Sequence, residues 1–224
     1  METTEIDGFS LGIEPTQKRG VEARDRLFDA AMEEFEARGI QGSRVENIVA
    51  EAGTSWGTFF RYFPRKEDVL LFAAARHFRT YLRPVYEAGL GDPDRTMWNV
   101  ARELFSQMMV PRYSPSVHAA MIDETVRHPA RFAAILDEGE LPIIALVTGL
   151  LEEGQRRGEI RTDVDAFEAA IVIGAGVMFS TTRVIGAVAE GQLPGSEIEA
   201  VAGRAFDLVW TGLGSEVPGK PGEP

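Results

Sequence analysis

The sequence contains no cysteine, so it forms neither disulfide bonds nor a thiolate metal site. Its opening stretch, METTEIDGFSLGIEPTQ, is acidic and lacks the basic start and apolar centre of a signal peptide. No apolar run approaches the roughly 18 residues that a membrane helix requires, and the longest candidate, around residues 169–180, contains glycines. We therefore expect a cytoplasmic protein without a membrane partner.

Motifs of catalysis are also missing. The chain has no Gly-x-Ser-x-Gly elbow, no Walker loop and no Gly-x-Gly-x-x-Gly motif. Its histidines, His77, His118 and His128, are not spaced as metal ligands, and the pair Glu124 and His128 is more often a surface contact than a metal site. We expect no enzyme activity, no metal and no cofactor.

Strand signals are nearly absent, because no stretch sustains an alternation of apolar and polar residues. Apolar residues recur instead at the 3.6-residue period of helices along almost the whole chain. With 224 residues, the chain is long enough for one or two packed domains. The sequence predicts an all-α protein of about nine helices in two parts, divided near residues 83–92.

Positive charge is scarce and local. The formal net charge of −12 argues against indiscriminate binding to nucleic acid, because neutralising phosphates requires clustered Lys and Arg. Residues 43–79 nevertheless hold six basic residues against four acidic ones, a local charge of +2. A contact with DNA is therefore expected only within this segment.

Three short helices in this region are arranged as a helix-turn-helix. Apolar residues from Leu27 to Phe35 mark the first helix, Ser43 is a candidate amino-terminal cap of the second, and residues 52–55 form the turn before the third. Gly53 suits the turn because glycine tolerates positive φ. In such a unit the helix after the turn enters the major groove. The alternative interpretation is an ordinary helical hairpin.

Residues after the turn favour the first interpretation. Thr58, Arg61 and Tyr62 face away from the expected aromatic core, and their side chains are good phosphate donors. Lys66 adds a cation at the start of the next helix. These side chains predict a surface that contacts a nucleic-acid backbone.

Residues 24–71 resemble the DNA-binding domain of the TetR (tetracycline-repressor-like) family. The pattern that carries the resemblance begins with Leu27, Ala30-Ala31, Phe35 and Gly39, continues with Ser43-x-Val45-x-x-Ile48, and ends with Ala52-Gly53-x-Ser55-x-Gly57-Thr58-Phe59-Phe60-x-Tyr62-Phe63-x-x-Lys66-x-x-Leu70. The resemblance implies a disordered acidic tail at 1–16, a helix-turn-helix domain at 17–65, a connecting helix at 66–84, an effector-binding and dimerisation domain at 85–213 and a disordered tail at 214–224.

The resemblance also implies which residues contact DNA. Ser43 and Arg44 would touch phosphate, Trp56, Gly57 and Thr58 would face bases, and Tyr62 and Lys66 would hold the backbone. The full predicted set is Ser43, Arg44, Ser55, Trp56, Gly57, Thr58, Phe60, Arg61, Tyr62 and Lys66.

Two positions depart from the family pattern. Phe60 stands where the family usually has Tyr, so a hydroxyl is lost and apolar contact with a thymine methyl or a sugar is left. Trp56 stands where a small, polar or basic residue is commoner. Trp56 either presses on the DNA or packs back on its own domain, and the sequence leaves both interpretations open.

Helix-turn-helix proteins gain affinity by pairing two copies on two half-sites, and in the resembled family the last two long helices form the dimer. Residues 167–188 and 199–213 are the corresponding segments here, although their apolar residues would also fill a monomer core. The predicted interface residues are Ile173, Val177, Thr181, Phe206, Val209 and Trp210.

Bulky, adaptable side chains in the middle helices suggest a pocket for a small apolar or amphipathic effector, with plain core packing as the alternative. Two polar residues, His118 and Arg183, are candidates to orient the ligand. The predicted pocket set is Trp98, Phe105, Met108, Met109, His118, Met121, Phe132, Val147, Met178, Phe179 and Arg183.

The resemblance implies a ligand-responsive repressor. It would bind a palindromic double-stranded operator as a homodimer and leave it when the effector binds. The alternative is a helical interaction or sensor protein of the same fold with lost or atypical DNA binding.

Overall fold

The computed structural model describes residues 18–110, 112–135, 143–189, 191–194 and 197–213. Within these ranges the secondary structure is helical and contains no β-strand, which confirms the all-α prediction. The predicted tails at 1–16 and 214–224 lie outside the described residues.

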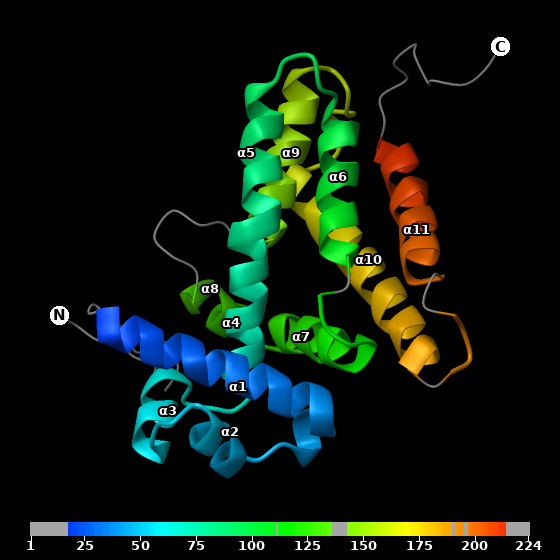
Figure 1. The fold of residues 1–224 in the computed structure, drawn as a ribbon. Helices are drawn as coiled ribbons and strands as arrows, with labels where there is room; N and C mark the ends of the chain where they lie inside the picture. Colours follow the sequence, from blue (N-terminus) through cyan, green and yellow to red (C-terminus); the bar gives the residue numbers. More distant parts are fainter. Residues whose placement is uncertain (1–17, 111, 136–142, 190, 195–196, 214–224) are drawn as a thin grey trace. The chain divides into compact units, whose positions relative to one another are not determined.

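Helical segments follow one another along the chain with short connections (Figure 1). Helical backbone continues without a break from α4 through the π-helical segment η1 into α5, so the described segments amount to ten helices, close to the predicted nine. The bounds are α1 (Lys18–Gly42), α2 (Val45–Glu51), α3 (Trp56–Tyr62), α4 (Asp68–His77), η1 (Phe78–Leu82), α5 (Arg83–Gly91), α6 (Met97–Met109), α7 (Pro115–Arg127), α8 (Pro129–Ile135), α9 (Ile143–Arg156), α10 (Ala166–Ala189) and α11 (Glu197–Leu213).

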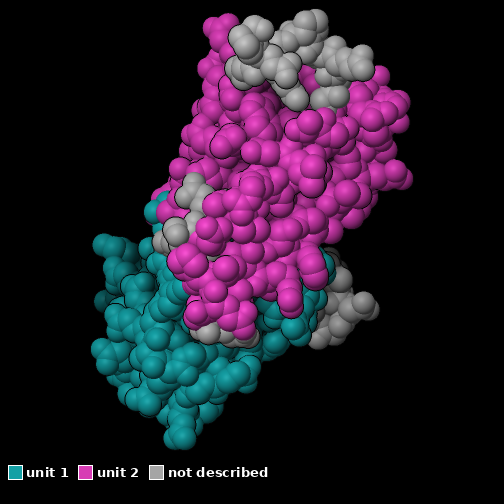
Figure 2. Space-filling model, turned by 90° about the vertical axis from the view of Figure 1, so that its right-hand side faces the viewer, with its two compact units in different colours: residues 1–76, 111–138 teal, residues 77–110, 139–224 magenta. Residues whose placement is uncertain are grey.

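The chain divides into two packed units, coloured separately in Figure 2. Unit 1 comprises residues 1–76 and 111–138, and unit 2 comprises residues 77–110 and 139–224. Helices α7 and α8 therefore pack with the amino-terminal helices, whereas the sequence had placed all of residues 85–213 in one domain. Apolar periodicity identifies the buried face of a helix but not the helix that covers it, so this grouping could not be read from the pattern.

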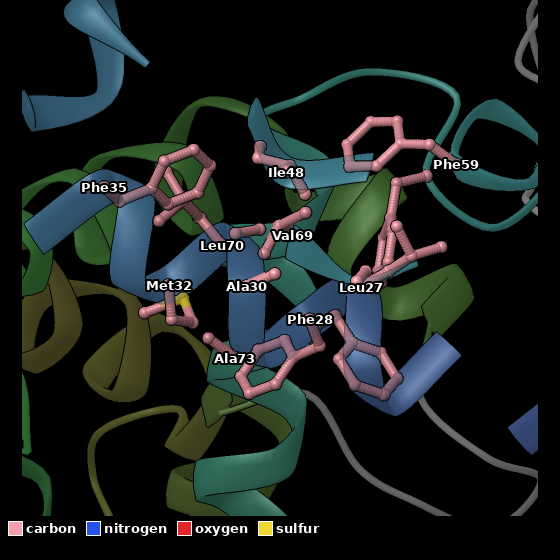
Figure 3. Close-up of a cluster of buried hydrophobic side chains, with 14 of the residues drawn as sticks. Leu27, Phe28, Ala30, Met32, Phe35, Ile48, Phe59, Val69, Leu70 and Ala73 are labelled. Carbon is pink, nitrogen blue, oxygen red and sulfur yellow. The ribbon is translucent and has the colours of Figure 1, made fainter. Parts of the chain in front are cut away.

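The core of unit 1 is built from α1, α2, α3, α4 and α7. Phe59 and Phe63 are buried in it, and Phe72 meets the rings of Phe28 and Phe63 edge-on, with centroid separations of 5.4 and 5.8 Å. Figure 3 shows apolar side chains of the cluster directed toward one another. Because burial of each such side chain stabilises the fold by about 1.5–3 kcal/mol, this core fixes α3 firmly on its scaffold.

The turn between α2 and α3 follows from a glycine. Gly53 has a φ of 61°, which glycine adopts without steric cost. The Thr54 amide donates to the Val49 carbonyl at 2.9 Å, which closes the carboxyl end of α2. Ser55 then caps α3 by accepting from the Thr58 amide at 3.2 Å. These local bonds set the direction in which α3 leaves the turn.

The start of α2 differs from the prediction. Arg44, rather than Ser43, occupies the cap position of α2, and its own side chain makes no capping hydrogen bond. Ser43 instead donates its hydroxyl to the Ile40 carbonyl at 2.7 Å. The serine therefore stabilises the end of α1, one turn earlier than expected.

Unit 2 is a bundle in which α10 packs against α9 and α11, and α6 packs against α5, α9 and α11. Glycines permit close approach in this bundle: a Cβ atom at Gly149 would lie 2.5 Å from the Tyr86 hydroxyl, and one at Gly154 would collide with Ile160. The helices of unit 2 are thus packed through specific small residues.

Helix α10 is longer and more apolar than the sequence analysis allowed. Residues 166–188 form a stretch of 23 residues that contains an 18-residue window with a mean hydropathy of 1.7, enough by length and composition alone to cross a membrane, contrary to the expectation that no run approaches this length. One face, with Ala170, Ile173 and Val177, is buried within unit 2. Its other face is apolar and exposed, which bears on assembly below.

Candidate nucleic-acid interface and ligand cavity

The outward face of α3 carries two large rings. Trp56 is 47% exposed and Phe60 is 39% exposed, while Phe59 on the opposite side is fully buried. The centroids of the Trp56 and Phe60 rings are 5.5 Å apart, and Phe60 meets Phe59 edge-on at 5.3 Å. Neither outer ring packs into the core, so both are presented to solvent on the helix that follows the turn.

The hydroxyls beside these rings bond to each other. The oxygens of Ser55 and Thr58 are 2.9 Å apart, and Ser55 also accepts from the Thr58 amide. Gly57 lies between them without a side chain. This part of α3 therefore offers mainly aromatic surface.

Exposed cations flank the aromatic surface along the chain. Arg44 precedes α2, and Arg61 lies in the last turn of α3 with its guanidinium 5.9 Å from the centroid of the Tyr62 ring. Tyr62 is half-buried against the core of unit 1. The predicted residues Arg44, Arg61 and Tyr62 thus lie on the helix-turn-helix, and two of them reach solvent as cations.

Lys66 and Ser43 bond to backbone within unit 1. The Lys66 ammonium donates to the carbonyls of Ile40 at 2.6 Å and Ser43 at 3.1 Å, and Ser43 is itself buried. An ammonium has three donor hydrogens, so these two bonds use two of them. Lys66 joins the end of α1 to the chain segment before α4, a role that the sequence did not indicate.

Glu34 on α1 holds the start of α2. Its carboxylate accepts from the Asn47 side chain at 2.7 Å and from the Arg44 amide at 3.3 Å. Burial alone raises the pKa of Glu34, but the hydrogen bonds from Asn47 and Arg44 and the nearby Arg38 outweigh it, so the pKa lies below its usual value. This contact was not predicted, because residues thirteen positions apart on separate helices share no sequence signal.

Helices α7 and α8 reach the start of α4 through ion pairs. Arg131 of α8 donates to both carboxylate oxygens of the buried Asp68 at 2.6 and 2.7 Å, and Asp68 also accepts from the Arg65 amide at 2.8 Å. The Arg65 guanidinium lies 3.3 Å from the carboxylate of Glu124 on α7. The loop between α3 and α4 is therefore held from two helices that the sequence had assigned to the effector domain.

Three residues predicted for the effector pocket lie in unit 1. Met121 belongs to its main core, and Phe132 packs with Leu71 and Ala75. His118 is buried, and burial lowers the pKa of its imidazole. None of the three lines the cavity described next.

Unit 2 contains a cavity of about 90 Å³ with an almost wholly apolar lining. Three residues predicted for the pocket, Phe105, Met108 and Val147, line it, as does Leu82 of η1. Four residues predicted for the dimer interface also line it, namely Ile173, Val177, Phe206 and Trp210. The structure thus brings part of both predicted sets together around one space.

The remaining predicted pocket residues are placed elsewhere. Trp98 is half-buried beside the cavity lining, where its ring stacks on Phe206 at 5.3 Å. Phe179 is 71% exposed, and Arg183 is exposed on the same helix. Because successive helical residues are rotated by about 100°, Phe179 points away from the side of α10 that holds Val177. The side chains of Met109 and Met178 lie outside the described part of the structure.

Large apolar side chains are exposed on α10, and α11 adds Leu208 to them. The most exposed of them are Val172 at 64%, Phe179 at 71% and Leu208 at 77%. Of the residues predicted for the dimer, Thr181 is buried inside unit 2, and Val209 is half-buried. The sequence analysis did not predict which residues of α10 are exposed, because an almost uniformly apolar helix has no periodic signal.

Comparisons with known proteins match this arrangement. Residues 27–73 match the family model for bacterial regulatory proteins of the tetR family. The chain is 42% identical over 53 residues to the uncharacterized HTH-type transcriptional regulator YdgC of Bacillus subtilis, which is 24% of this chain and 27% of YdgC. It is 27% identical to the HTH-type transcriptional repressor AcnR of Corynebacterium glutamicum over 74% of this chain and 88% of AcnR.

Solved structures share the fold over most of the chain. Thermus thermophilus FadR, a TetR-family transcriptional repressor solved in complex with lauroyl-CoA, has a TM-score of 0.67 and 27% identity over 89% of this chain and 100% of FadR. SmeT, the repressor of the Stenotrophomonas maltophilia multidrug efflux pump SmeDEF, has a TM-score of 0.61 over 91% of this chain and 98% of SmeT. At 19% identity, SmeT is evidence for the fold alone.

Proposed function

We propose that the chain is a DNA-binding transcriptional regulator of the TetR family that acts as a cytoplasmic repressor and not as an enzyme. It binds a palindromic operator as a homodimer and leaves the operator when a small apolar ligand occupies the cavity of unit 2. The observation that carries the proposal is the exposed face of α3 on a firmly packed helix-turn-helix.

DNA binding through α3 is supported by the chemistry of its surroundings. The helix exposes Trp56, Phe60 and Arg61 beyond the turn at Gly53, and Arg44 adds a second exposed cation. Cations hold the phosphate backbone, while groups that reach base edges give sequence preference. The acidic remainder of the chain disfavours DNA contact elsewhere.

Homodimerisation is supported by the outer faces of α10 and α11. Large apolar residues in water are costly when they gather in one patch, and Val172, Phe179 and Leu208 are among the most exposed apolar residues described. A second copy related by two-fold symmetry would cover the same patch on both chains. Two copies would also present two copies of α3 to the two half-sites of a palindrome.

An apolar ligand is supported by the lining of the cavity in unit 2. The lining offers almost no polar surface to pair with a charged group, and the related FadR was solved with lauroyl-CoA. The cavity is smaller than the roughly 300–1,000 Å³ of most ligand pockets. A ligand would therefore have to widen it, so the ligand favours a conformation different from the empty one.

Release of DNA then follows from linkage. Leu82, which lines the cavity, belongs to η1, and η1 follows α4 directly in the chain. A ligand that displaces Leu82 would favour one conformation of the continuous helix formed by α4 and η1, and DNA would favour another. The ligand weakens DNA binding by the ratio of its affinities for the two states.

A helical interaction protein without specific DNA binding is the second candidate. Its supporting observation is the same aromatic pair, Trp56 and Phe60, because exposed rings also suit a protein surface. The two candidates differ in whether the full-length protein selects DNA by sequence.

Selection from a library of genomic fragments tests the proposal. The full-length protein should enrich fragments that share a palindrome. The logarithm of the association constant for these fragments should fall linearly with the logarithm of the salt concentration. Enrichment without a shared sequence would favour the second candidate.

The ligand is tested with 1-dodecanol as an uncharged, mainly apolar probe. It should raise the thermal midpoint of the wild-type protein and weaken operator binding, whereas Val147→Phe, which fills the cavity, should abolish both effects. Valine-to-phenylalanine substitution at the exposed Val126 of unit 1 is the matched control. An unchanged response in Val147→Phe would place the ligand outside the cavity.

A further inference from the structure

Trp56 and Phe60 lie one helical turn apart and form a continuous aromatic edge on α3. Their centroids are 5.5 Å apart, and both rings are more than a third exposed. Phe60 is supported from behind by the buried Phe59 at 5.3 Å. The edge is therefore held in place by the core and is directed outward.

The position of this aromatic edge limits what covers it. It lies within the segment that matches the DNA-binding family model, on the helix that follows the turn, and the chain carries the exposed cations Arg44 before it and Arg61 after Phe60. A duplex offers phosphates to those cations and a groove to α3. An apolar protein surface would leave the two cations unpaired, so DNA is the occupant that suits the whole face.

The chemistry of the exposed side chains indicates which group of the DNA they can contact. Phenylalanine has no hydrogen-bonding group, and the Ser55 and Thr58 hydroxyls beside the rings bond to each other. The apolar group that the major groove displays is the C5-methyl of thymine. We propose that Trp56 and Phe60 read thymine methyl groups and that this contact sets much of the operator preference. The inference rests on the proposed binding to an operator.

Deoxyuridine tests the inference without changing the protein. Each thymine of the selected operator is replaced by deoxyuridine, first in one half-site and then in both. Each replacement removes one methyl group and leaves every base-pair hydrogen bond intact. Binding of the full-length wild-type protein is measured by fluorescence anisotropy. We expect a loss of about fourfold for a methyl group contacted in one half-site and about fifteenfold when it is removed from both, from the transfer free energy of one methylene-sized group.

Variants connect that loss to the two rings. Trp56→Ala and Phe60→Ala should bring the ratio of affinities for thymine and deoxyuridine operators close to one at the positions that each ring contacts. Phe60→Leu, which keeps an apolar side chain, should retain part of the ratio. Val126→Ala, an exposed apolar residue of α7 in the same unit, is the matched control and should leave the ratio unchanged. Thermal melting checks that each variant is folded.

The outcomes separate the inference from the proposed function. If the protein selects a palindrome but no deoxyuridine substitution alters its binding, the reading of thymine is overturned and the regulator stands. The same conclusion follows if Trp56→Ala and Phe60→Ala both keep the wild-type ratio, and the rings are then free for a protein partner. If no DNA sequence is selected, the proposed function itself fails.

Discussion

At the scale of single residues, Lys66 shows how one side chain joins two roles. The family resemblance assigns it to phosphate, while the structure shows its ammonium bonded to the carbonyls of Ile40 and Ser43. Both assignments are compatible, because a lysine that stiffens the end of α1 also fixes where its remaining donor points.

Replacing Lys66 by methionine should therefore destabilise the protein as well as weaken DNA binding. Hydrogen bonds from a charged donor contribute about 1.5–3 kcal/mol, so we expect a loss of that order in the free energy of unfolding, measured by urea denaturation. Lys18→Met, at an exposed position on α1, is the control. Unchanged stability in Lys66→Met would show that the two bonds contribute nothing.

His118 makes the stability of the protein depend on pH. Burial lowers the pKa of its imidazole in the folded state, so the unfolded chain binds a proton more readily than the folded one. Stability should fall as the pH drops below about 6.5, the ordinary pKa of histidine, and continue to fall until the folded-state pKa is passed.

The measurement is the urea midpoint between pH 8 and pH 5 for the wild type and for His118→Leu. The stability difference between the two proteins should shift in favour of the variant as the pH decreases. A difference that is constant across this range would contradict the assignment of the buried neutral imidazole.

At the scale of elements, the main finding is that α7 and α8 belong to the DNA-binding unit. The pair of Arg131 and Asp68 is mostly buried and joins α8 to the first turn of α4. Removing one partner of a buried pair leaves an uncompensated charge, which typically costs about 3–5 kcal/mol.

Arg131→Leu should accordingly lower the free energy of unfolding by about that amount, while Arg131→Leu combined with Asp68→Asn should cost less than the sum of the single changes. Urea denaturation of all three proteins checks this. Arg127→Leu, which removes an exposed pair with Asp123, should leave the free energy of unfolding nearly unchanged. Additive effects at Arg131 and Asp68 would show that the pair is not coupled.

Sequence patterns predicted the elements better than their partners. The short helices, the turn at Gly53 and the buried Phe59 and Phe63 follow from local spacing and appear as expected. The position of Met121 and Phe132 in unit 1 does not follow from local spacing, because periodicity indicates which face of a helix is buried but not which helix packs against it. The outer face of α10 was missed for a related reason, since apolar residues occupy all of its sides.

The candidate site was likewise predicted in part. Trp56 and Phe60 were recognised as departures from a pattern, but only the structure shows both rings exposed and in contact. The hydrogen bonds of Lys66 and Glu34 link residues that are distant in sequence, so no short-range sequence pattern predicts them.

At the scale of the whole molecule, dimerisation would remove the exposed apolar side chains of α10 and α11 from water. Val172→Glu together with Leu208→Glu would place charges on those helices without touching the cavity lining. We expect the wild type to be a dimer by light scattering after gel filtration, and the double variant to be a monomer with weakened operator binding.

Val126→Glu is the matched control for this prediction, since it adds a charge at an exposed apolar position of unit 1 and should leave the dimer intact. A double variant that stays dimeric would show that another surface joins the two copies.

The distribution of charge over the whole molecule is compatible with DNA binding by an acidic protein. The net charge of −12 repels duplex from most of the surface, while residues 43–79 carry a local charge of +2. We therefore expect contact with DNA to be confined to the helix-turn-helix.

The central claim, that α3 reads an operator, is tested most directly by comparing the affinity of the full-length protein for the selected palindrome and for a scrambled duplex of equal composition. Anisotropy titrations at about 150 mM salt give both dissociation constants. We expect a preference of at least about 10³-fold for the palindrome, with two chains bound per duplex. Equal affinity for the two duplexes would contradict it.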